Sequence, residues 1–155
     1  MTRGPLATLL GVGLLAAALQ PALAHSPEEV QALVERAADY IREHGQQQAF
    51  ADFNRPDGGF VDGELYIFCN DISGVQLANG GNPKMVGKNL SGLRDFEGRL
   101  TTADINRIGQ TVGHGWYEYL WPNPAKGRIE RKTTYVLRID DRTVCASGYF
   151  KPDQR

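Results

Sequence analysis

The sequence has little cysteine and no excess of charge of either sign. Only two of its 155 residues are Cys, too few for a disulfide-rich miniature scaffold or a zinc site of four thiolates. With 17 basic and 18 acidic side chains the net charge is −1, so the chain as a whole has no basic field to hold nucleic acid or an anionic membrane. Two Trp, six Tyr and six Phe residues argue against a disordered chain, and the length suits one domain.

Sequence motifs of catalysis and metal binding are also missing. We find no HExxH, GxSxG, P-loop or GxGxxG pattern. The three histidines, His25, His44 and His114, lie far apart in the sequence and have no ligand-spaced partners. The acidic segment 57–64 departs from the spacing of a calcium loop and is interpreted as a turn. We therefore expect no enzyme, no catalytic residue, no metal and no cofactor.

Residues 1–24 have the pattern of a secretory signal peptide. Arg3 precedes an apolar run over 6–19, and the segment ends in Ala22-Leu23-Ala24. The run is shorter than the ~20 residues of a membrane span, which favours cleavage near Ala24 over an uncleaved anchor. We expect one mature domain over 25–155, periplasmic or secreted and without a membrane span. His25 would then be the amino terminus, where copper binding is a minor alternative.

Export bears on the two cysteines. Cys69 and Cys145 both lie in strand-like runs, and neither belongs to a CxxC pair. An oxidising compartment permits a disulfide between them, whereas two buried, unreactive thiols are the other interpretation. The sequence does not decide between the two, because it does not place their Cα atoms.

The order of predicted elements indicates an α+β fold. Ser26, Pro27 and Glu29 form a capping box before a helix that Gly45 closes, and a shorter helix follows over 46–53. A second long helix is predicted over 101–112, with Thr101 or Thr102 as its cap and Ile105, Ile108 and Val112 facing inward. Between and after them, short turns join strands into a mainly antiparallel sheet. The predicted strands are 65–69, 75–78, 115–121, 128–139 and 142–150, and a long loop covers 79–99.

One strand carries a cluster of aromatic residues. Alternation places Tyr117, Tyr119 and Trp121 on one face and Trp116 on the other. The first face is either core or the wall of a small-ligand pocket, since Tyr and Trp offer an apolar body and a polar rim. Lys132, in the next strand, is a candidate to bind a carboxylate there; the alternative is a solvated lysine on an edge strand.

Several ordered motifs resemble single Cache domains. The resemblance runs from about 27 to 152 and so covers nearly the whole mature chain. Its parts are the hairpin 65–79, the loop Asn82-Pro83-Lys84-Met85-Val86-Gly87-Lys88-Asn89-Leu90, the strand and turn 115–124, the strand Lys132-Thr133-Thr134-Tyr135-Val136, and the closing strand 148–152.

The resemblance implies a PAS-like fold, with a long N-terminal helix packed on a five-stranded antiparallel sheet and a loop-covered pocket on the other face. Members of this family are usually extracytoplasmic sensing domains that bind small molecules, often short acids such as acetate, propionate, pyruvate or lactate. Carried over residue by residue, the implied ligand-binding positions are Tyr66, Asn79, Tyr119, Trp121, Lys132 and Tyr135.

Three departures from the family pattern bear on these expectations. Many relatives have His-Pro where this chain has Asn79-Gly80, which affects a polar contact of the ligand. Lys132 and Tyr135 are three residues apart, so alternation puts them on opposite faces unless a bulge intervenes. No apolar segment follows Pro152, so we expect any signal to pass through a partner.

Two hypotheses for function follow. The first is an exported domain that binds a short-chain carboxylate without catalysis and acts with a membrane-bound signalling protein. The alternative is an accessory interaction subunit of an extracytoplasmic sensor or respiratory complex, with its pocket filled by its own side chains.

Overall fold

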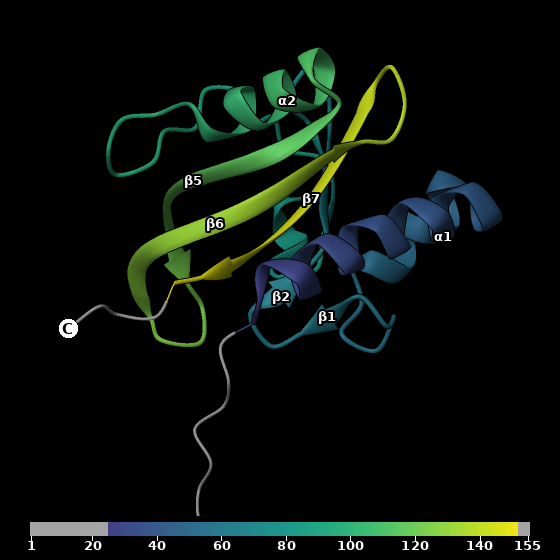
Figure 1. Cartoon of the computed structure of the whole chain (residues 1–155), viewed down its shortest axis with the longest axis horizontal. Helices are drawn as coiled ribbons and strands as arrows, with labels where there is room; N and C mark the ends of the chain where they lie inside the picture. Colours follow the sequence, from purple (N-terminus) through teal and green to yellow (C-terminus); the bar gives the residue numbers. More distant parts are fainter. Residues whose placement is uncertain (1–24, 152–155) are drawn as a thin grey trace, which may run out of the picture.

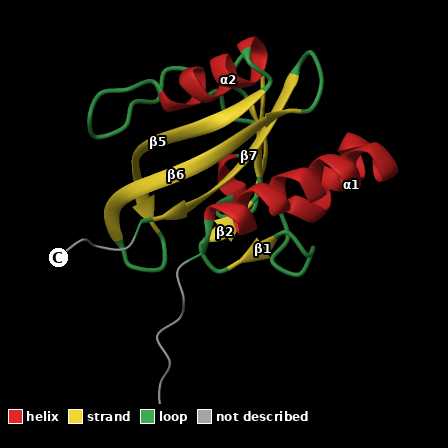
Figure 2. Cartoon of the chain, viewed as in Figure 1, coloured by secondary structure: helices red, strands yellow, loops and turns green. Residues whose placement is uncertain are grey.

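The computed structural model describes residues 25–151, so the predicted signal peptide and residues 152–155 lie outside the described residues. Two layers of helix and loop enclose a central sheet (Figures 1 and 2). The helical elements are α1 (Pro27–Phe53), the 3₁₀ helix η1 (Pro83–Met85) and α2 (Thr101–Thr111). The strands are β1 (Val61–Asp62), β2 (Leu65–Tyr66), β3 (Phe68–Asp71), β4 (Gln76–Asn79), β5 (His114–Asn123), β6 (Arg128–Arg138) and β7 (Thr143–Phe150).

Helix α1 begins as its sequence predicts. The hydroxyl of Ser26 accepts the N–H of Glu29, whose carboxylate accepts the N–H of Ser26 in return. Gly45 has non-helical angles with φ at 78°, so α1 consists of two helical pieces joined at a kink, in agreement with the two predicted helices. The buried face includes Val30, Val34 and Ala37. No helix within residues 25–151 has the length and hydrophobicity needed to cross a membrane.

The main sheet has five antiparallel strands in the order β4-β3-β7-β6-β5. Alternation along β7 separates its two faces: Cys145 belongs to a core with α1, whereas Val144 and Ala146 belong to a second core with α2. The long helix and α2 therefore cover opposite faces. This arrangement confirms the predicted α+β, PAS-like architecture of a long N-terminal helix on a five-stranded antiparallel sheet. The strands β1 and β2 form a separate small hairpin.

The two cysteines face each other across neighbouring strands. Cys69 of β3 is the register partner of Cys145 in β7, and the structure joins them in a disulfide. Both side chains are fully buried in the core beneath α1. The bond closes a sequence separation of 76 residues and ties the middle of the chain to its last strand.

Two details predicted for α2 are wrong. Its N-cap is Leu100, which makes no side-chain capping bond, while Thr101 and Thr102 are buried. The two threonines face the interior because the helix starts one residue earlier than a threonine cap would require. Val112, predicted to face inward, is 70% exposed because the helix ends at Thr111 and the chain turns at Gly113 towards β5.

Candidate functional site

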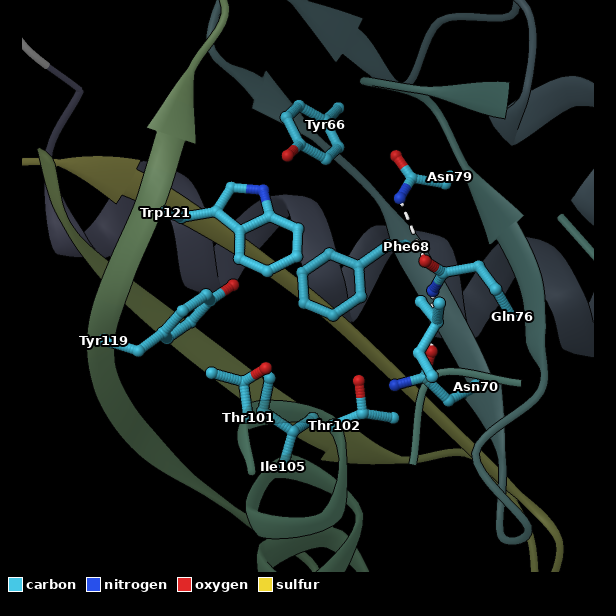
Figure 3. A pocket seen from close by; sticks show the side chains of 11 residues that line it. Tyr66, Phe68, Asn70, Gln76, Asn79, Thr101, Thr102, Ile105, Tyr119 and Trp121 are labelled. Atoms are coloured by element: carbon cyan, nitrogen blue, oxygen red, sulfur yellow. Dashed lines mark hydrogen bonds between the residues drawn. The ribbon is translucent and has the colours of Figure 1, made fainter. Parts of the chain in front are cut away.

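A cavity lies on the face of the sheet covered by α2. We call it the inner cavity; it is small, leaving about 20 Å³ for the centre of a water-sized sphere. About 10–15 Å³ suffices for one water molecule by this measure, so the cavity has room for one water and little more. Figure 3 shows that its walls come from strands at the two edges of the sheet, β3 and β4 on one side and β5 on the other, and from the start of α2. The lining residues are Tyr66, Phe68, Asn70, Gln76, Asn79, Leu90, Thr101, Thr102, Ile105, Tyr119 and Trp121.

Strand β5 provides the aromatic wall. Tyr117, Tyr119 and Trp121 point to the same face, as the alternation predicts; the first two rings stack with centroids 5.5 Å apart, and the Tyr119 and Trp121 rings meet edge to face at 5.7 Å. Burial raises the pKa of the Tyr119 phenol, so this group is neutral. Thr134 donates a hydrogen bond of 3.4 Å to the Tyr119 oxygen. The wall therefore combines apolar ring surface with neutral hydroxyls.

Lys132 is fully buried behind this cavity. It is the register partner of Tyr119 and of Phe150, so its side chain enters the same layer from β6. Its ammonium donates a 2.8 Å hydrogen bond to the phenol oxygen of Tyr66 and lies 4.0 Å from the centroid of that ring. The rings of Phe150 and Phe68 lie farther away, at 5.2 and 5.8 Å. Among residues 25–151 no carboxylate pairs with this ammonium, and Tyr66 is its one hydrogen-bond acceptor.

A chain of amides forms the opposite wall. The Gln76 side chain donates to Asn70 at 2.6 Å and accepts from Asn79 at 3.0 Å, and both bonds are drawn in Figure 3. Asn70 extends the chain to Asn106 of α2 at 3.5 Å. Because each amide both donates and accepts, the wall satisfies its buried polar groups and remains polar toward the cavity.

Asn79 also fixes the start of the following loop. Its side-chain oxygen accepts the N–H groups of Gly81 at 3.1 Å and Asn82 at 2.8 Å, while its nitrogen contacts Gln76 and the sulfur of Met85. All four hydrogen-bonding positions of this amide are thus used within the protein. Asn79 therefore lines the cavity and also holds the loop backbone against it.

The loop over residues 80–100, which we call the lid loop, runs from β4 to α2 and contacts both edge strands of the sheet, β4 and β5. At one end, Gln76 of β4 exchanges backbone hydrogen bonds with Lys88 and Gly87. At the other end, Arg99 donates to the carbonyl of Glu118 in β5 at 2.8 Å. These contacts pair backbone N–H and carbonyl groups of β4 and β5 that an edge strand would otherwise leave without a hydrogen bond.

Asp95 is the main anchor of the lid loop on β5. Its buried carboxylate accepts the N–H groups of Glu97 and Arg99 at 2.9 Å each, the guanidinium of Arg99 at 3.2 Å and the N–H of Leu120 at 3.3 Å. Burial pushes the pKa of Asp95 upward, but the N–H groups of Arg99, Leu120 and Glu97 outweigh it and hold the pKa below its ordinary value. The carboxylate is therefore ionised and occupied by donors from the protein.

The structure brings together five of the six predicted ligand-binding residues. Tyr66, Asn79, Tyr119 and Trp121 line the inner cavity, and Lys132 lies directly behind Tyr66. The sixth does not join them.

Tyr135 projects to the opposite face of the sheet, as the three-residue offset from Lys132 indicates. It packs in the core beneath α1, and its ring lies 5.1 Å from that of Trp116. No bulge occurs between Lys132 and Tyr135, because their pairing with β5 and β7 runs in unbroken register. The structure thus does not place Tyr135 in the cavity.

Several lining residues were not singled out by their sequence. The sequence pattern predicts Thr101 or Thr102 as a helix cap, although two adjacent threonines before an apolar helix face are also compatible with a polar lining. Asn70 opens the predicted turn 70–74 and Gln76 lies in the predicted strand 75–78, and only the pairing of β3 with β4 shows that the two are side by side.

The fold is that of a PAS-like domain, and comparison with known proteins identifies its family. The model of a family described as the Cache domain matches residues 30–142. The chain belongs to the Cache domain family. Domains of this family are extracytoplasmic sensor domains that bind small-molecule ligands in membrane chemoreceptors.

Individual relatives agree with this assignment. The methyl-accepting chemotaxis protein McpP of Pseudomonas putida is 27% identical over 103 residues, which are 66% of this chain but only 18% of that protein. A methyl-accepting chemotaxis protein of Vibrio parahaemolyticus has the same fold with a TM-score of 0.69 and 20% identity, covering 79% of this chain and 86% of that one.

Two further solved structures have the same fold. A Cache chemosensory domain studied for its recognition of carboxylic acids has a TM-score of 0.68 and 24% identity, covering 81% of this chain and 92% of that one. A periplasmic sensor domain of a chemotaxis protein has a TM-score of 0.62 and 25% identity over 81% of this chain and 90% of that one.

Proposed function

We propose that this chain binds a small organic acid, with the carboxylate taken up by the ammonium of Lys132 and the phenol of Tyr66, and that it does not transform its ligand. The observation that carries the proposal is the buried, positively charged side chain for which residues 25–151 provide no carboxylate. An ammonium removed from water is costly unless an anion or several hydrogen bonds compensate it. A carboxylate ligand would supply that compensation.

The surroundings of Lys132 suit an anion of this kind. Its ammonium has three donor positions, of which Tyr66 uses one, so two remain for carboxylate oxygens. Tyr119 and Trp121 add apolar ring surface for the carbon part of the ligand. The solved Cache domain studied for carboxylic acid recognition lends support, since it shares this fold.

The proposal includes that the domain does not catalyse a reaction of its ligand. The groups that line the inner cavity are phenols, an indole, amides, hydroxyls and hydrocarbon side chains, none of which is paired with a general base. Such a lining binds and orients a ligand, and it offers no nucleophile activated for attack.

Export and signalling complete the proposal. The predicted signal peptide would place the domain in the periplasm or outside the cell after cleavage near Ala24, a position outside the described residues. A membrane-bound signalling protein is then the partner expected to respond to the loaded domain. The chain spans less than a fifth of the length of its chemotaxis relative.

A second function, that of an accessory interaction subunit without a free ligand, is favoured by the small volume of the inner cavity. Calorimetry of the purified protein with acetate, propionate, pyruvate and lactate separates the two. We expect saturable binding of at least one acid. Replacing Lys132 by Met should weaken it tenfold or more, because a charged hydrogen bond contributes ~1.5–3 kcal/mol.

The control is Lys84→Met in the exposed helix η1, which removes the same charge near the lid loop and should leave binding unchanged. Binding that survives Lys132→Met would remove the proposed carboxylate site. No binding of any acid by the wild-type protein would favour the interaction subunit.

A further inference from the structure

A second, larger cavity lies outside the first. We call it the outer cavity; it offers about 480 Å³ to the centre of a water-sized sphere and opens between the lid loop and the end of β5. Its residues from the lid loop are Gly81, Asn82, Met85, Leu93, Arg94, Asp95 and Phe96, and those from β5 and its turn are Leu120, Trp121, Pro122 and Pro124. Tyr66 and Asn79 complete the lining.

The two cavities share Tyr66, Asn79 and Trp121. These three side chains lie along one rim of the inner cavity in Figure 3, which makes them the partition between the two spaces. Tyr66 is also the hydrogen-bond partner of Lys132. A group that enters from the outer cavity and passes Trp121 therefore meets the phenol of Tyr66, which holds the buried ammonium of Lys132; Lys132 itself lines neither cavity.

The outer cavity is apolar in its chemistry. Of its two charged lining residues, Asp95 is fully engaged by donors from the lid loop and β5, and Arg94 donates to the carbonyl of Gly98 at 2.6 Å. The remaining lining is mostly hydrocarbon, sulfur, proline and indole. Phe96 is 71% exposed although it belongs to this lining, so a large aromatic ring at the rim lacks an apolar cover.

We infer that the ligand is a monocarboxylate whose apolar tail is longer than the two or three carbons of the shortest acids. The inference rests on the proposed function: the carboxylate reaches Tyr66 and Lys132, and the tail lies in the outer cavity against Trp121, Met85 and Phe96. The volumes support placing the tail outside, because about 20 Å³ inside leaves no room for an apolar tail whereas about 480 Å³ outside suits a drug-sized apolar body.

A chain-length series tests the inference. Calorimetric titration of the purified protein with acetate, butanoate, hexanoate and octanoate should show affinity rising about two- to fourfold per added methylene, the effect of burying hydrocarbon that leaves water. Adipate, which has the length of hexanoate but ends in a second carboxylate, should bind more weakly than hexanoate because its far end would enter an apolar space.

The outcomes distinguish this inference from the function on which it rests. Equal affinities along the series, or adipate binding more tightly than hexanoate, would overturn the apolar tail and leave the carboxylate site intact. Failure of every acid to bind would overturn the proposed function itself.

An exposed residue of the outer cavity provides the variant. Phe96→Ser should lower the ratio of hexanoate to acetate affinity severalfold, and its high exposure makes loss of folding an unimportant effect. Val112→Ser is the matched control, since Val112 is 70% exposed at the end of α2 and lines neither cavity. An affinity ratio that is the same in both variants and the wild type would contradict the placement of the tail.

Discussion

Replacing Lys132 by Met should stabilise the free protein while it weakens ligand binding tenfold or more. The change keeps an unbranched side chain of similar length and removes only the charge and its donors. The ammonium is fully buried, and its partners within residues 25–151 are one phenol oxygen and the faces of aromatic rings. A residue retained for an absent ligand should be a net cost to the unliganded fold.

The magnitude follows from the opposing contributions. Dehydration of an ammonium costs several kcal/mol even after the protein relaxes. Against this stand ~1.5–3 kcal/mol for a charged hydrogen bond and up to ~2 kcal/mol for a desolvated cation over a ring such as Tyr66. Substitution of buried charges by well-packed apolar groups stabilises proteins by ~1–4 kcal/mol in known cases. Since the Tyr66 oxygen loses its donor, we expect the lower part of that range, ~1–2 kcal/mol.

Urea denaturation of both proteins without ligand measures this difference. With a slope of ~1–3 kcal/mol per molar urea, the midpoint of the Met variant should rise by roughly 0.3–2 M. Saturating ligand should stabilise the wild type, by ~2.7 kcal/mol at one hundred times the dissociation constant, and should stabilise the variant by about half as much or less. Alanine is unsuitable here because it would open a cavity of its own, at ~2–5 kcal/mol for a large buried side chain.

The control for this experiment is Lys84→Met, an exposed lysine whose replacement should change stability by no more than ~0.5 kcal/mol. A Lys132→Met protein that is less stable than the wild type by more than ~1 kcal/mol would refute the reasoning. The protein's own rings and phenol would then compensate the charge, and no anion would be needed.

Three other changes test the structure around the site. Asp95→Asn should lower the free energy of unfolding by ~1–3 kcal/mol at pH 7. Because the folded-state pKa of Asp95 lies below its ordinary value, its contribution is complete above pH ~4 and is lost as the pH falls further, so the gap between the variant and the wild type should narrow below pH ~4 in urea titrations. Replacing Cys69 and Cys145 together by Ala should cost ~2–4 kcal/mol by the same assay, since the disulfide closes a separation of 76 residues. Gly81→Ala should cost ~1–3 kcal/mol, because a methyl group there would overlap the ring of Tyr66; adding Tyr66→Ala should make the two effects non-additive in a double-mutant cycle.

Each of these changes has a matched comparison. Asp141→Asn alters an exposed turn carboxylate and should leave the pH dependence intact, whereas a constant gap between Asp95→Asn and wild type from pH 7 to 3 would contradict the assigned pKa direction. Reductant on the wild type should reproduce the loss seen in the double Ala variant, and an unaffected midpoint would argue against the disulfide. Gly92→Ala, in open space on the lid loop, should be neutral; additive effects at positions 81 and 66 would disprove the contact.

The α+β class and most elements of the fold are predictable from the sequence because their signals are local, whereas the PAS-like arrangement rests on the family resemblance. The capping box at Ser26, the glycine at the kink of α1 and the alternation in β5 each depend on residues a few positions apart. The cap of α2 was predicted wrongly, since the burial of Thr101 and Thr102 depends on contacts with distant strands that local patterns do not record.

The candidate site was predictable only in part, because its parts meet through sheet register. Alternation put Tyr119 and Trp121 on one face, and the family resemblance put Lys132 beside them. The same resemblance also implied Tyr135 as a ligand-binding residue, but the alternation of side chains along β6 places it on the other face of the sheet. The amide wall and the outer cavity were not predictable, because both depend on how the lid loop folds back onto β4 and β5.

Tyr66 links the buried cation to the lid loop. Its oxygen receives the hydrogen bond of Lys132, and the backbone of Gly81 lies so close to its ring that a side chain there would not fit. Asn79 holds the N–H of Gly81, and its amide is joined to Gln76 in the cavity wall. A carboxylate that shares or replaces the bond between Lys132 and Tyr66 must therefore act on a ring that the lid loop already touches. The lid loop is also hydrogen-bonded to both edge strands of the sheet. The binding of a carboxylate at the Lys132 ammonium and the position of the lid loop are therefore linked through Tyr66.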